Sequence, residues 1–172
     1  MDSFFSFPRK FTLAHPDVFY TNGILESFLE MTANLIANGD IPGAKFVMKF
    51  VNGRPEQKVL ETLNLEDNMQ YTGENVSRQE RLRELADSEA VLFIQRGTGN
   101  SYISEKFYEL LTLKKKVLAV VPNPVAYEEI ANRDGDVYVA HIKNQAQIAE
   151  MFLKMYTDWE KEEEMVLYSS AA

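Results

Sequence analysis

Short apolar runs alternate along this chain with longer segments whose apolar residues recur at helical spacing. The apolar runs predict strands at 11–14, 44–51, 69–72, 90–94, 117–121 and 137–142. The helically spaced segments predict helices at about 23–38, after Pro55, at about 78–87, from Asn100 or Ser101, near 127–131, and from about Gln145 onward. Since strands alternate with helices, the sequence predicts a doubly wound α/β fold. Its mostly parallel sheet would carry helices on both faces, as in Rossmann-like domains.

Local signals sharpen this picture. Ser77 and Glu80 have the spacing of a capping box, which predicts that a helix begins there. Asn22 is the expected N-cap of the first long helix. The run at 90–94 is short, continuous and apolar, which is typical of a central parallel strand. In such a sheet the carboxyl ends of the strands share one edge, and ligands bind at that edge.

Length and composition narrow the class of protein. The 172 residues predict a single Rossmann-like domain over 1–172 that ends in a C-terminal helix. Cysteine is absent and the two histidines lie far apart, so we expect no disulfide, no metal site and no cofactor. A net charge of −8 disfavours binding to nucleic acid or to anionic membranes. No apolar run reaches membrane-spanning length and no signal peptide is evident, so we expect a cytoplasmic protein.

The loop after the 90–94 strand carries the strongest chemical signal. Gly97 and Gly99 allow positive φ angles and let the backbone approach a ligand closely. Side chains that can hydrogen-bond to a phosphate accompany them, at Thr98, Asn100 and Ser101. Arg96 can add a charged, forked donor, and the amides of a following helix would favour an anion. The alternative is a tight polar turn that holds no ligand.

The stretch 87–124 resembles the SLOG superfamily, which groups DNA-processing protein A, the LOG-type phosphoribohydrolases and molybdenum-cofactor-carrier-like proteins. The resemblance rests on an Arg-bearing helix with Arg78 and Arg81, the turn at Asp87, the apolar strand and the Gly97 loop. It implies a small-molecule nucleotide or nucleoside bound by the loop together with Arg78 and Arg96. It also implies a homodimer or a higher homo-oligomer. From the residues alone, Arg78 and Arg81 would equally well pair with nearby glutamates.

Two other functions stay open from the sequence. Glu105 lies near the place of the catalytic glutamate of LOG-type enzymes, which implies an N-glycosidic hydrolase of the nucleoside-monophosphate phosphoribohydrolase type. Nucleoside deoxyribosyltransferases share this architecture and use a glutamate nucleophile after a comparable strand, so Glu105 would serve equally in a transferase of that type. The loop at 96–101 departs from the LOG pattern Pro-Gly-Gly-x-Gly-Thr-x-x-Glu, and a first-turn glutamate also favours the helix dipole without catalysis. The remaining alternative is a non-catalytic interaction protein with the same fold.

Overall fold

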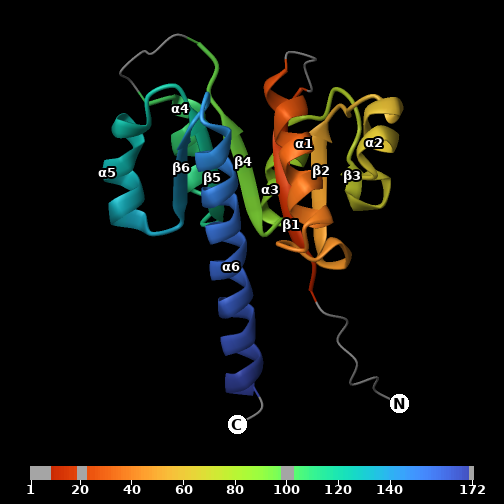
Figure 1. The fold of residues 1–172 in the computed structure, drawn as a ribbon. Coiled ribbons are helices and arrows are strands. Elements are labelled where there is room, and N and C mark those ends of the chain that lie inside the picture. Colours follow the sequence, from red (N-terminus) through yellow and green to blue (C-terminus); the bar gives the residue numbers. More distant parts are fainter. Residues whose placement is uncertain (1–8, 19–22, 98–102, 171–172) are drawn as a thin grey trace.

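A computed structural model describes residues 9–18, 23–97 and 103–170. In this part of the chain six parallel strands form one sheet in the order β3-β2-β1-β4-β5-β6 (Figure 1). The strands are β1 (Phe11–Val18), β2 (Phe46–Asn52), β3 (Met69–Tyr71), β4 (Ala90–Ile94), β5 (Lys116–Val121) and β6 (Val137–His141). The predicted doubly wound, parallel fold class is therefore confirmed.

Helices cover both faces of the sheet. The helices are α1 (Ile24–Ala37), α2 (Gln57–Leu63), α3 (Arg78–Ala86), α4 (Glu105–Leu111), α5 (Pro124–Asp134) and α6 (Gln145–Ser170). Short 3₁₀ turns lie at Gly43–Lys45 and Glu66–Asn68. Helices α1, α2 and α6 pack on one face and α3, α4 and α5 on the other, which gives three layers (Figure 1). None of the helices described is long and apolar enough to cross a membrane.

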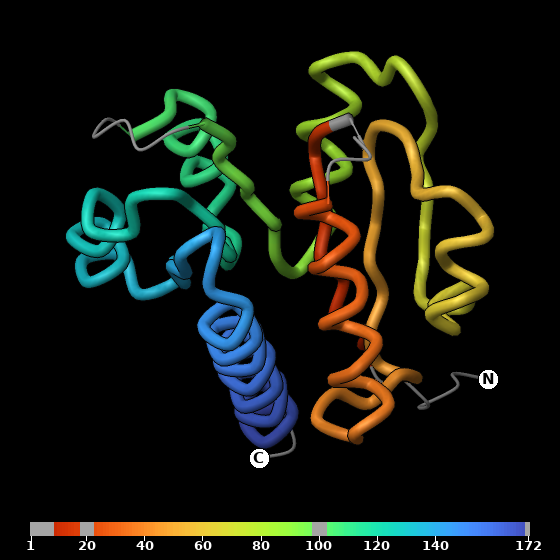
Figure 2. Tube along the Cα trace, turned by 45° about the horizontal axis from the view of Figure 1, so that its top comes forward, coloured from red at the N-terminus to blue at the C-terminus, as the bar shows by residue number. Residues whose placement is uncertain are grey.

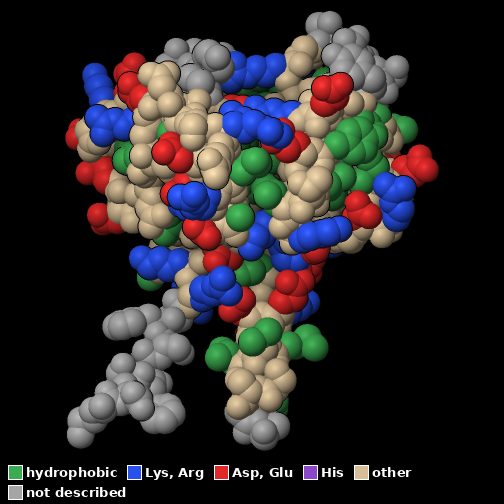
Figure 3. Space-filling model, turned by 180° about the vertical axis from the view of Figure 1, so that it is seen from behind, with side chains coloured by type: hydrophobic (Ala, Val, Ile, Leu, Met, Phe, Trp, Pro, Cys, Tyr) green, Lys and Arg blue, Asp and Glu red, His purple; other side chains and the backbone are tan. Residues whose placement is uncertain are grey.

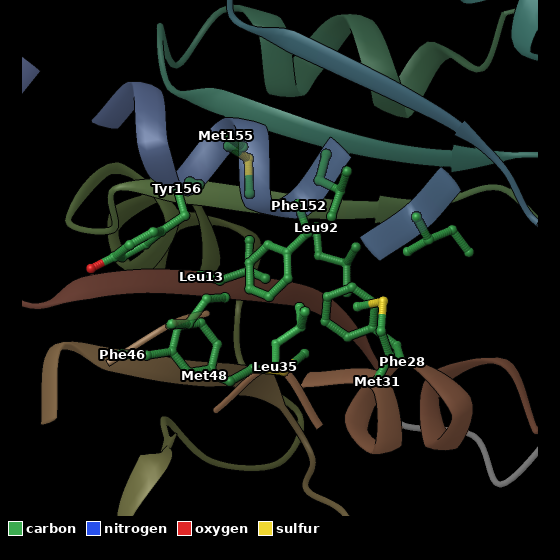
Figure 4. Close-up of a cluster of buried hydrophobic side chains, with 14 of the residues drawn as sticks. Leu13, Phe28, Met31, Leu35, Phe46, Met48, Leu92, Phe152, Met155 and Tyr156 are labelled. Carbon is green, nitrogen blue, oxygen red and sulfur yellow. The ribbon is translucent and has the colours of Figure 1, made fainter. Parts of the chain in front are cut away.

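The larger apolar core lies between the sheet and the layer of α1, α2 and α6 (Figure 4). Phe152 of α6 is fully buried near its centre. Its ring lies 5.6 Å from the ring of Phe28 on α1 and 5.7 Å from the ring of Phe46 on β2. One aromatic side chain thus joins the last helix to the first helix and to the sheet.

The sheet divides at its carboxyl edge between β1 and β4. These strands pair only at Leu13 with Ala90 and at Ala14 with Val91, whereas β1 stays beside β2 as far as Val18. Strand β4, in contrast, stays paired with β5 up to its last residue, Ile94. We predicted that β1 ends at Ala14, but it continues to Val18 although Pro16 has no N–H to donate. The half with β1 to β3 and the half with β4 to β6 therefore part where the strand order reverses (Figure 2).

The structure confirms one predicted helix start and corrects another. The capping box of α3 is present: the Glu80 amide donates to the Ser77 hydroxyl at 3.2 Å, and the Ser77 amide donates to the Glu80 carboxylate. The predicted start of α4 at Asn100 or Ser101 is wrong. The helix begins at Glu105, because the Ser104 hydroxyl caps it by accepting the Lys106 amide at 3.3 Å.

The first long helix also begins later than predicted. Helix α1 starts at Ile24, and its N-cap is Gly23 with a φ of 84°. This positive φ suits a residue without a side chain. The predicted N-cap, Asn22, lies outside the described residues.

We predict that Phe152→Ala lowers the free energy of unfolding by about 3–5 kcal/mol, because the cavity it leaves is lined by three elements. Chemical denaturation would measure this loss. The matched control is Tyr168→Ala on the same helix, whose side chain is 85% exposed and whose removal should cost under about 0.5 kcal/mol. Equal losses from the two variants would contradict the described packing of α6.

Candidate functional site

A crevice of about 420 Å³ opens at the carboxyl edge, where β1 and β4 part. Its lining comes from the ends of β1, β2 and β4, from helix α3 and from the start of α4. The lining residues are His15, Asp17, Asn52, Arg81, Phe93, Ile94, Gln95, Arg96, Ser104 and Lys106. Doubly wound sheets bind ligands at this reversal of strand order. The crevice is therefore the candidate functional site.

Positive charge dominates the lining of the crevice. Arg81 on α3, Arg96 after β4 and Lys106 on α4 converge on it, and Asp17 is the one carboxylate among the lining residues. Asp17 pairs with Lys106, while Arg81 forms no ion pair with any described residue. From behind, Lys and Arg side chains are visible near the edge where the strands end (Figure 3). A chain of net charge −8 thus presents a local surplus of cations at one place.

A chain of hydrogen bonds fixes the backbone that carries Arg96. The Gln95 amide donates to the Val120 carbonyl at 3.0 Å, which extends the contact between β4 and β5 by one residue. The Tyr127 hydroxyl donates to the Gln95 side chain and accepts the Ser104 amide at 3.4 Å. Since Tyr127 itself is buried, these bonds hold the start and the end of the connection from β4 to α4 against α5. Arg96 therefore leaves the sheet from a fixed point.

His15 is the most unusual group in the crevice. His15 lies on β1, and only 2% of its surface is exposed to solvent. Its Nδ1 has no hydrogen-bond partner among the described residues. Burial, reinforced by the nearby charges of Lys106 and Arg96, lowers the pKa of His15 to about 3. The imidazole is therefore neutral at physiological pH. Burial also lowers the pKa of Lys106, because a desolvated ammonium is disfavoured, and Glu109 partly opposes that shift.

The structure brings only part of the predicted site together. Arg96 lines the crevice, and Gly97 follows it with a φ of 118°, a conformation that favours glycine. The other predicted loop residues, Thr98, Gly99, Asn100 and Ser101, lie outside the described residues.

The other two predicted residues lie away from the crevice lining. Arg78 is an exposed side chain whose guanidinium pairs with Glu109 of α4 through contacts of 2.9 and 3.2 Å. Glu105 is the exposed first residue of α4 and is not among the lining residues. Its catalytic role and the ligand-binding role of Arg78 stay predictions.

Among the ionisable residues that line the crevice, sequence reasoning missed His15, Asp17 and Lys106. His15 follows directly on the apolar run at 11–14, and Asp17 comes two residues later, so polar groups after a predicted strand were the available signal. Lys106 carried no such signal, because its place depends on where α4 begins.

The sequence matches no protein-family model and no curated protein. Among solved structures, the chain is similar to the C-terminal domain of the glycosyl transferase group 1 family protein LpcC from Francisella tularensis. The TM-score is 0.65 at 14% identity, over 89% of this chain and 78% of that one. The glycosyltransferase WaaG, which is involved in lipopolysaccharide biosynthesis, gives a TM-score of 0.62 at 15% identity, over 87% of this chain and 39% of that one.

A third similar structure is the trehalose-6-phosphate protein of E. coli, bound with UDP-2-fluoro glucose. Its TM-score is 0.56 at 9% identity, over 87% of this chain and 36% of that one. The chain thus spans well under half of the length of the two longer proteins. At these identities the likeness shows a shared fold.

These similarities correct the resemblance to the SLOG superfamily. The structural neighbours are glycosyltransferase domains, so the SLOG assignment is wrong, and the phosphoribohydrolase activity that it implied has no support. The physical reason is that a strand, a glycine-bearing turn and a helix recur throughout doubly wound sheets. In addition, α4 begins at Glu105, several residues beyond the glycine loop that the resemblance rested on.

We predict that His15 makes the protein less stable in acid. The unfolded chain binds a proton at His15 below pH 6.5, whereas the native state does so only near pH 3, so stability falls as the pH drops through this window. Between pH 8 and pH 5 the contribution is about 2 kcal/mol. Urea denaturation at both pH values should show a correspondingly smaller loss for His15→Phe than for the wild type. His141→Gln retains His15 and is the control, and equal losses in wild type and His15→Phe would refute the prediction.

Proposed function

We propose that the crevice binds the phosphate-bearing part of a nucleotide sugar, and that the chain serves as a nucleotide-sugar-binding domain in glycosyl transfer. The observation that carries this proposal is the convergence of Arg81, Arg96 and Lys106 where β1 and β4 part. Guanidinium and ammonium groups are the usual partners of phosphate oxygens, and an arginine offers two parallel donors.

The net charge of the whole chain explains why phosphate binding depends on this crevice. A net charge of −8 repels an anion at long range, so binding of a phosphate requires a local surplus of positive charge. The crevice supplies that surplus, since its one lining carboxylate is already paired with Lys106. A bound phosphate would compete with Asp17 for this ammonium. The Asp17 carboxylate thus occupies the Lys106 ammonium until an anionic ligand displaces it.

The size and the place of the crevice favour a nucleotide-type ligand. A volume of about 420 Å³ falls within the range of small-molecule sites. The similar structures of LpcC and WaaG are glycosyltransferases, and the E. coli trehalose-6-phosphate structure holds UDP-2-fluoro glucose. The nucleotide-type ligand expected from the sequence agrees with this proposal. The homo-oligomeric state stays a prediction.

We predict that Arg81→Gln and Arg96→Gln each weaken binding of uridine diphosphate by roughly tenfold or more, because each removes a charge-assisted hydrogen bond. Isothermal titration calorimetry would measure the affinities. The matched control is Arg83→Gln, an exposed arginine of the same helix α3 that is not among the lining residues.

An opposite change tests the same site. Asp17→Asn removes the carboxylate that competes for Lys106, so it should tighten the binding of uridine diphosphate. If the wild type binds neither uridine diphosphate nor UDP-glucose, or if the Arg81 and Arg96 variants bind like Arg83→Gln, the proposed function is wrong.

A further inference from the structure

His15 is a buried polar side chain in the crevice, and one of its two ring nitrogens has no hydrogen-bond partner among the described residues. Its Nδ1 is fully buried and has no partner among the described residues. Buried polar atoms in native proteins are nearly always hydrogen-bonded, and leaving one unpaired is costly. Because His15 also lines the crevice, a ligand seated against its ring can supply the missing partner.

The surroundings of His15 hold the ring in place. Its imidazole packs against the ring of Phe50 on the neighbouring strand, with 5.9 Å between the centroids. The pairing of β1 with β2 is regular up to His15 and Phe50, and irregular between His15 and Val18. The histidine is therefore the last residue of β1 with regular sheet pairing, directly before the strand changes course beside the crevice.

The chemistry of His15 differs from that of the cations around it. With its pKa lowered to about 3, the ring is neutral, so it offers one N–H donor and one lone-pair acceptor. A phosphate at neutral pH mainly accepts hydrogen bonds and is served by Arg81, Arg96 and Lys106. A hydroxyl both donates and accepts, and a neutral imidazole can meet it in either role.

We infer that the crevice is built for a two-part ligand, in which the cations hold the phosphate and His15 hydrogen-bonds to a hydroxyl of the attached sugar. This inference rests on the proposed function and deepens it, because it assigns a phosphorylated polyol as the substrate class. The hydroxyl can belong to the ribose of a nucleotide or to a transferable hexose. Four probes separate these sources: pyrophosphate, glucose 1-phosphate, uridine diphosphate and UDP-glucose.

The test compares His15→Phe and His15→Asn with the wild type by calorimetry on these probes. Phenylalanine removes both ring nitrogens, whereas asparagine keeps a donor and an acceptor. We expect His15→Phe to lose roughly threefold to tenfold in affinity for the probe whose hydroxyl meets His15, and His15→Asn to regain part of it. Affinity for pyrophosphate should stay unchanged, which also shows that the variant is folded.

A second measurement needs no change at His15. The chain has two histidines, so ¹⁵N spectra of the imidazoles contain two sets of signals, and His141→Gln identifies that of His15. A sugar-bearing probe should shift the His15 nitrogens strongly, and pyrophosphate should shift them little.

The outcomes separate this inference from the proposed function. If the wild type binds none of the four probes, both fail. If it binds them but His15→Phe keeps full affinity for every hydroxylated probe, only the role of His15 is overturned. A loss of pyrophosphate affinity in His15→Phe would overturn it too, because it would place the phosphate at the histidine.

Discussion

The site depends on one constraint, which is that β1 cannot remain paired with both of its neighbours to its end. It leaves β4 after Ala14 and continues beside β2, while β4 continues beside β5. Two neighbouring crossovers of a doubly wound sheet run in opposite directions from this point, which leaves a crevice outside the carboxyl ends of the strands. The crevice is therefore a consequence of topology, and the side chains at the strand ends determine what it can hold.

Bringing three cations together around such an opening is unfavourable because they repel one another and lose hydration, and the local structure reduces this penalty. Lys106 is partly desolvated, which lowers its pKa, and its pairing with Asp17 offsets part of the penalty. His15 stays neutral among these charges, so it adds a polar contact without adding repulsion. A second positive group at that buried position would have to share the same low-dielectric space with Lys106 and Arg96. The neutral ring thus fits the charge balance of the crevice.

The sequence predicted most of the fold because its signals are local. The apolar run of β4 and the capping box of α3 depend only on neighbouring residues, and both predictions are confirmed. The start of α4 was wrong because Gly97 and Asn100 suggested an early turn into the helix, whereas the cap is formed by Ser104. The site was only partly predictable for a related reason. Arg96 follows its strand directly, but the approach of His15, Arg81 and Lys106 depends on long-range packing.

At the opposite, amino edge of the sheet, the length of the last helix determines which side chains are exposed. Helix α6 has 26 residues, which correspond to a length of about 39 Å, whereas the eight residues of β1 reach only about 27 Å. Since α6 starts at the carboxyl edge, it must extend past the amino edge, as Figure 1 shows. This excess length exposes the apolar side chains Met165, Val166, Leu167 and Tyr168. They lie at the far end of the molecule from the crevice, so a protein surface that covered them would leave the ligand's entrance open.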